Sequence, residues 1–141
     1  MNATDAVPEA TAVEATAVDA PFVRIVSDAD GRSRFVDQEP AVTIHPAEHG
    51  VPELWASPPW PVDRLQFLTV KGGTLVPDWH TAPRRQFVTF LTGWAEIEVG
   101  SGEIRRLPSG STVLVEDLNG TGHVTRHQPG DQRVLVVPLD P

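Results

Sequence analysis

The chain has 141 residues, 40% hydrophobic side chains and a formal net charge of −8, which predicts one domain with a single core. The negative charge argues against nucleic acid and anionic membranes as partners, because both need clustered Lys and Arg side chains. The chain has no cysteine, so disulfide scaffolds, thiolate zinc sites and cysteine nucleophiles are excluded, and a metal would need His and oxygen ligands. We read no membrane-spanning run and no signal peptide, and therefore expect a cytoplasmic protein.

Residues 1–20 differ in composition from the rest. The motif Glu-Ala-Thr-Ala-Val occurs at 9–13 and again at 14–18, without basic or large aromatic residues. Such a segment cannot bury enough apolar surface to offset its ordering entropy, so we predict a disordered acidic arm. A helix over Ala10–Ala20 is the alternative, which Ala and Glu favour and Thr and Val oppose.

Residues 21–141 carry β signals throughout. The run Phe22–Val26, the turn residues Asp28–Gly31 and the run Arg34–Val36 predict a hairpin. Further short strands are predicted at 41–44, 65–70, 86–91, 94–99, 103–107, 111–115, 123–127 and 133–137. Turn signals every 8–12 residues are typical of an all-β sandwich or barrel.

Residues 45–61 are rich in Pro and Trp. Because proline cannot donate a ladder hydrogen bond, we predict a covering loop and not a central strand here. Trp55 and Trp60 need burial, which a loop wrapped over the domain or its mouth would provide.

Two polar segments, 78–86 and 116–123, are predicted to face each other across the barrel. In the first, His80, Ala82, Gln86 and Gly93 fit the frame of the first cupin motif, which carries His-x-His, a Glu and a Gly. His80 matches the first His, Ala82 the second and Gln86 the Glu.

The second segment extends the match. Gly110 corresponds to the Gly that opens the second cupin motif, Glu116 occupies the usual Pro position, and His123 matches the His after a lengthened loop. The stretch Gly73–Leu139 therefore resembles a cupin. This resemblance implies a single cupin-like β-barrel (jelly roll) that binds a small molecule and forms a homodimer.

The resemblance also implies a metal site at His80, Gln86 and His123, with Ala82 contributing no ligand. Asp78, Glu116 or Asp117 could supply a carboxylate in its place. One divalent ion (iron, zinc, nickel or manganese) or no cofactor are both open, with a metal-free site favoured because the second His and the Glu are replaced. His127 could point the same way as His123, since it lies four residues on along a strand.

We expect His80 and His123 to act as acid and base, because imidazole changes charge near neutral pH. Gln86, which shares a strand face with Val88 and Phe90, would orient the substrate or bind an oxyanion. The candidate substrate-binding residues are Trp79, Arg84, Arg85, Phe90 and Glu116.

These candidates have alternatives. Arg84 and Arg85 could bind an anionic substrate, or at least one of them pairs with Glu116 or Asp117 and joins the two loops. Trp79 either stacks on a ligand or packs under the Pro-rich segment. Gly120 and Gly122 are expected to serve loop geometry and not phosphate binding.

The favoured function is a small-molecule enzyme of the isomerase, cyclase, dehydratase or decarboxylase type, with secondary metabolism as one setting. Two alternatives stay open: a metal-dependent cupin dioxygenase and a non-catalytic ligand-binding cupin.

Overall fold

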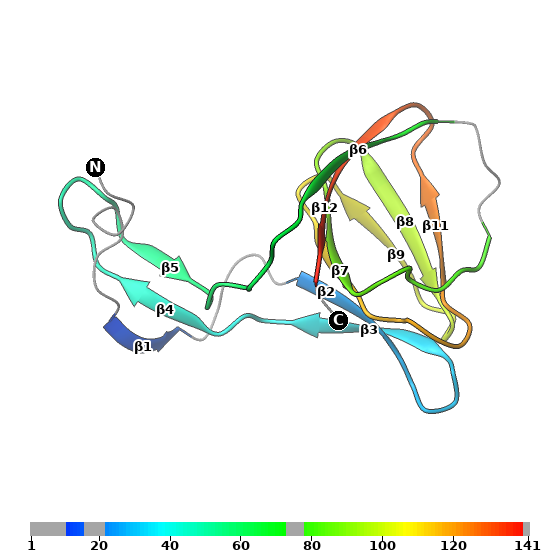
Figure 1. The fold of residues 1–141 in the computed structure, drawn as a ribbon, viewed down its shortest axis with the longest axis horizontal. Coiled ribbons are helices and arrows are strands. Elements are labelled where there is room, and N and C mark those ends of the chain that lie inside the picture. Colours follow the sequence, from blue (N-terminus) through cyan, green and yellow to red (C-terminus); the bar gives the residue numbers. More distant parts are fainter. Residues whose placement is uncertain (1–10, 16–21, 73–77, 140–141) are drawn as a thin grey trace. The chain divides into compact units, whose positions relative to one another are not determined.

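The computed structural model of the chain is all-β (Figure 1). It describes residues 11–15, 22–72 and 78–139. Every regular element in these ranges is a strand, and they contain no helix of the length and apolar character needed to span a membrane. The prediction of an all-β fold is confirmed.

The chain divides into two units. One comprises residues 1–21 and 39–60, and the other comprises residues 22–38 and 61–141. We predicted residues 21–141 as one domain, and this boundary stays a prediction. Residues 39–60 group with 1–21 because the strand that follows residue 41 pairs within its own three-stranded sheet.

The smaller unit contains β1 (Thr11–Ala15), β4 (Val42–His45) and β5 (Leu54–Ala56), in the order β1-β4-β5. β1 rules out the alternative of a helix over residues 11–15. The other residues of 1–20 lie outside the described ranges, so their disorder stays a prediction.

Strand β5 shows that 45–61 is not a loop throughout, but β5 is an end strand of its sheet, so the prediction of no central strand here holds. Leu54, Trp55 and Ala56 contain no proline, so their backbone can pair antiparallel with β4. The expected burial of the tryptophans is also wrong, because Trp55 is 49% and Trp60 42% exposed.

The larger unit contains two sheets. The six-stranded sheet has the order β3-β2-β10-β7-β12-β6, in which β10 and β2 run parallel and the other neighbours antiparallel. Its strands are β2 (Phe22–Ser27), β3 (Ser33–Gln38), β6 (Gln66–Val70), β7 (Gln86–Phe90), β10 (Thr112–Val115) and β12 (Gln132–Pro138). The three-stranded sheet has the order β11-β8-β9, with β8 (Trp94–Val99), β9 (Ile104–Pro108) and β11 (His123–His127).

Both sheets of the larger unit contribute to one hydrophobic core. On β8 the predicted alternation holds, because Ala95, Ile97 and Val99 are at most 2% exposed while their neighbours are half-buried. These side chains belong to the same cluster as residues of the six-stranded sheet, among them Ile25, Phe90, Val113, Val115, Val134 and Val136. Two layers that share a core are the arrangement expected of a jelly roll.

Candidate functional site

A cavity of about 1040 Å³ opens among the strands of the larger unit. Its wall is mostly apolar and includes Val88, Val136 and Ile97, which come from both sheets. Polar side chains interrupt this wall at Lys71, Asp78, His80, Gln86, His123, Thr125, Arg126, His127 and Gln128. An apolar cavity with a few polar groups is typical of a small-molecule site.

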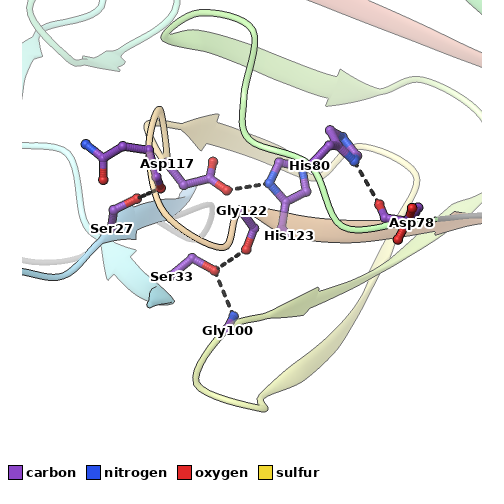
Figure 2. Close-up of polar contacts among 9 residues, drawn as sticks. Ser27, Ser33, Asp78, His80, Gly100, Asp117, Gly122 and His123 are labelled. Carbon is purple, nitrogen blue, oxygen red and sulfur yellow. Dashed lines mark hydrogen bonds and ion pairs between the residues drawn. The ribbon is translucent and has the colours of Figure 1, made fainter. Parts of the chain in front are cut away.

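The polar group most firmly held in this wall is His123. Its Nδ1 lies 2.6 Å from Oδ2 of Asp117, and the two side chains are 7% and 0% exposed (Figure 2). Because a carboxylate accepts, Nδ1 of His123 carries the hydrogen and Nε2 keeps its lone pair in the neutral ring.

Asp117 is incompletely satisfied. Among the described residues, its Oδ1 is the buried side-chain oxygen that receives no hydrogen bond. A buried carboxylate with one partner is costly for the fold. Such a cost is expected where a buried polar group serves a site.

His80 lies beside His123 at the exposed side of the site. The two residues exchange backbone hydrogen bonds of 3.0 and 2.9 Å, and their rings are 4.8 Å apart between centroids. Nδ1 of His80 lies 3.0 Å from the carbonyl oxygen of Asp78 (Figure 2). A carbonyl only accepts, so His80 also carries its hydrogen on Nδ1.

The loop that carries Asp117 is fixed by the hairpin of β2 and β3. Thr121 N donates to Gly31 O at 2.9 Å, and Ser33 Oγ donates to Gly122 O at 2.6 Å. Gly122 has φ of 73°, and a Cβ on it would collide with the backbone carbonyl of His80. The close approach of His80 and His123 therefore requires glycine here, which confirms its predicted role in loop geometry.

A second histidine on β11, His127, is also oriented by a hydrogen bond at its Nδ1. Nδ1 of His127 is 2.5 Å from Oε1 of Gln132, which is fully buried, and Nε2 of Gln132 donates to Thr92 O at 3.0 Å. The Thr92 carbonyl fixes the orientation of the amide, so its oxygen faces the ring and His127 carries the hydrogen on Nδ1.

Glu116 joins three segments outside the cavity wall. Its Oε1 accepts from Arg24 Nε at 2.6 Å and its Oε2 accepts from Arg85 Nε at 2.7 Å. Burial acts to raise the pKa of Glu116, but the hydrogen bonds from Arg24 and Arg85 outweigh it and hold the pKa below its usual value of 4.5. The prediction that an arginine of 84–85 pairs with Glu116 or Asp117 is confirmed for Arg85.

The structure brings most of the predicted site residues together. The cavity wall includes Trp79, His80, Gln86, Phe90 and His123. Trp79 is 41% exposed there. Arg84, Arg85 and Glu116 lie off the cavity; Arg84 borders a separate shallow depression beside Arg64 and Pro138.

Two functional relationships were not anticipated from the sequence. Asp117 was considered only as a metal ligand or an arginine partner, and its contact with His123 was not foreseen. The pairing of His127 with Gln132 was also missed. A carboxylate or amide within six residues of each histidine was the available signal, and it is a weak one because many loops contain such pairs.

The residues present do not fit a typical metal centre. Ala82 offers no donor, Gln86 offers a neutral amide, and the described part of the chain contains no group of three or more His, Asp or Glu side chains arranged to hold an ion. Catalytic zinc and related ions normally take at least three protein ligands. This set of donors therefore gives no basis for a metal-dependent step.

Comparison with known proteins adds little to this picture. No protein-family model and no curated protein matches the chain. A solved structure, that of protein NMB1881 from Neisseria meningitidis, aligns over 87% of this chain and 89% of its own length, with 12% sequence identity and a TM-score of 0.40. Similarity at this level assigns the chain to no family.

Proposed function

We propose that the larger unit is a cupin-like domain whose cavity performs proton transfer on a small organic molecule. The observation that carries this proposal is the buried Asp117–His123 pair, whose histidine borders a mostly apolar cavity. The apolar wall suits a ligand with a hydrocarbon or aromatic body, and a carbonyl group on that body would make a neighbouring C–H acidic enough for an imidazole base.

In the proposed reaction, Nε2 of His123 removes a proton from the carbon next to the carbonyl. The C–H electron pair moves into the carbon–carbon bond and the carbonyl oxygen becomes an enolate oxygen. His123 becomes an imidazolium, whose charge the Asp117 carboxylate balances at 2.6 Å. The same proton, or one exchanged with solvent, then returns to carbon and restores the neutral ring.

Gln86 and His80 have supporting roles in this scheme. Gln86 opens β7 and lines the cavity, so its amide N–H can donate to the developing enolate oxygen. His80 is exposed and its ring lies 4.8 Å from that of His123, which suits it to exchange protons between His123 and solvent. Returning the proton to another atom would give isomerisation or cyclisation, and loss of a β-hydroxyl would give dehydration.

Deuterium exchange tests this proposal without knowledge of the natural substrate. 4-Phenylcyclohexanone has an apolar body and exchangeable hydrogens next to its carbonyl, and its incubation with the protein in deuterium oxide can be followed by NMR. We expect wild-type protein to accelerate exchange, and His123→Ala and His80→Ala to lose about 10²- to 10⁴-fold of the acceleration. No acceleration by correctly folded wild type, with saturable ketone binding, would instead support the non-catalytic binding alternative.

We also propose that the protein forms a homodimer through β6, the end strand of the six-stranded sheet. Phe67 and Leu68 on β6, and Leu65 just before it, are 69%, 41% and 53% exposed, which is unusual for apolar side chains clustered on a sheet edge. Phe67→Lys is expected to yield monomers in sedimentation velocity. Ile104→Lys is the control, since Ile104 is 52% exposed on β9, the end strand of the other sheet. A wild-type protein that stays monomeric at high micromolar concentration would disprove the dimer.

A further inference from the structure

β11 presents two histidines to the cavity. It pairs with β8 in continuous register from His123 opposite Val99 to His127 opposite Ala95. Side chains two residues apart on a strand share a face, so His123, Thr125 and His127 form one row, and all three border the cavity. At about 3.3 Å per residue, the two histidines lie about 13 Å apart along this row.

The two histidines differ in what stands behind them. His123 is backed by a carboxylate, whereas His127 is backed by the neutral amide of Gln132. An amide oxygen fixes the hydrogen on Nδ1 without supplying a negative charge to stabilise an imidazolium. In the neutral ring, Nε2 of His127 is therefore the nitrogen that can accept a hydrogen bond.

The orientation of His127 is fixed by a network of hydrogen bonds behind the ring. Gln132 is a fully buried polar side chain, and both ends of its amide are used, one on His127 and one on the Thr92 carbonyl. Thr92 is itself held by Arg133, which accepts from Thr92 N and donates to Thr92 Oγ1 through its backbone. Burying such a network is favourable only if its members are satisfied. Among the described residues no hydrogen bond is made by Nε2 of His127, which borders the cavity.

We propose that His127 is a specificity-determining residue that accepts a hydrogen bond from a hydroxyl group on the ligand, at the end remote from the reacting carbon. This rests on the proposed function, in which the cavity binds the ligand and His123 reacts with it. It narrows the substrate class to elongated molecules with an apolar middle, a carbonyl at one end and a hydroxyl donor, such as a phenol, at the other.

Three matched ketones test this inference: 4-phenylcyclohexanone, 4-(4-hydroxyphenyl)cyclohexanone and 4-(4-methoxyphenyl)cyclohexanone. Their dissociation constants are measured by calorimetry on the full chain. We expect the phenol to bind about tenfold more tightly than the unsubstituted ketone, which is the effect of about one good hydrogen bond. The methoxy compound can accept but not donate, so it should gain nothing.

Two variants locate the effect. His127→Phe keeps a ring and removes the acceptor, so the preference for the phenol should vanish. Thr125→Val, between the two histidines on the same row, should keep it. Equal affinity of wild type for the phenol and the unsubstituted ketone, equal gains for phenol and methoxy compound, or absence of saturable phenol binding would each overturn the inference.

The result is separable from the proposed chemistry. If the preference for the phenol is present but neither ketone exchanges deuterium, His127 recognises the ligand and the proposed reaction is wrong. If both ketones exchange equally fast and bind equally well, the reaction stands and the role of His127 is wrong. The comparison of phenol and methoxy compound on wild type needs no variant, so it does not depend on how a substitution folds.

Discussion

His123 and His127, at the two ends of the row on β11, are both oriented through Nδ1, but by partners of different charge. Each histidine is oriented by a hydrogen bond that its Nδ1 donates to a side chain with little or no exposure, Asp117 at one end and Gln132 at the other. Because the carboxylate is charged and the amide is neutral, the two histidines suit different proposed roles, proton transfer for His123 and hydroxyl recognition for His127. A carboxylate stabilises the ring after it gains a proton, whereas an amide only fixes its orientation.

The two ends also differ in how the chain builds them. Gln132 opens β12 and lies five residues beyond His127, across the turn that joins β11 to β12. Asp117 belongs to a loop that depends on Gly31 and Ser33 of the β2–β3 hairpin and on Gly122. The His123 end is therefore the more sensitive to changes elsewhere in the fold.

The largest effect is expected from removing the charge at the His123 end. Asp117→Asn keeps the side-chain shape but cannot balance an imidazolium, so the rate of deuterium exchange into 4-phenylcyclohexanone should fall by about 10²- to 10⁴-fold. The exchange rate is measured by NMR, with circular dichroism to establish that the variant is folded. A rate within about threefold of wild type would show that the charge of Asp117 has no catalytic role.

The next effect concerns the loop geometry. Gly122→Ala should lower the free energy of unfolding by about 1–3 kcal/mol, because both the positive φ and the collision with the His80 carbonyl oppose a Cβ. Gly102→Ala is the matched control: Gly102 also has positive φ, at 97°, but a Cβ there would meet nothing within 4 Å. Equal losses in urea denaturation of the two variants would mean that the contact with His80 is unimportant.

A smaller and more selective effect is expected at the His127 end. Gln132→Leu removes the acceptor behind His127, so the ring is free to rotate and the roughly tenfold preference for 4-(4-hydroxyphenyl)cyclohexanone should be lost. The exchange rate of 4-phenylcyclohexanone should change by about twofold or less, since distant sites without shared partners act independently. A collapse of exchange together with binding would show that the two ends are not separate.

The smallest effect is expected at Glu116, on the free energy of unfolding. The folded-state pKa of Glu116 is lowered, so its stabilisation is fully present above pH 4.5, the ordinary value, and is lost as the pH falls through the folded pKa. Glu116→Gln should cost about 1 kcal/mol at neutral pH, a modest value because Arg24 and Arg85 are 33% and 41% exposed. Denaturation at pH 7 and pH 3 should show this difference shrinking in acid; a constant difference would exclude the pairing as its source.

The strands of the larger unit could be predicted from sequence because their signals are local. Alternation along Trp94–Val99 and turn residues at either end are visible without the fold. The same local signals placed Gln86 and Phe90 on one strand face, and both border the cavity.

Two features could not be predicted from the sequence: the strand within the Pro-rich segment, and the side-chain contacts that form only when distant parts of the chain fold together. Residues 45–61 were predicted to form a covering loop without a central strand, whereas 54–56, which contain no proline, form the end strand β5. Nothing in the order of residues shows that Asp117 turns toward His123 and Glu116 away to two arginines. That choice follows from the loop's hydrogen bonds to a hairpin some ninety residues earlier in the chain, such as the bond from Ser33, whose separation from Gly122 is 89 residues.

The most direct measurement is a long-range ¹H–¹⁵N NMR spectrum of protein labelled at histidine, recorded at a pH where the rings are neutral. Signals of His123 and His127 are assigned from His123→Ala and His127→Phe. The account predicts that both rings carry hydrogen on Nδ1 and leave Nε2 unprotonated, because Asp117 and Gln132 accept from Nδ1. A hydrogen on Nε2 of either ring would contradict it, since that ring could then neither remove a proton nor accept a hydroxyl in the cavity.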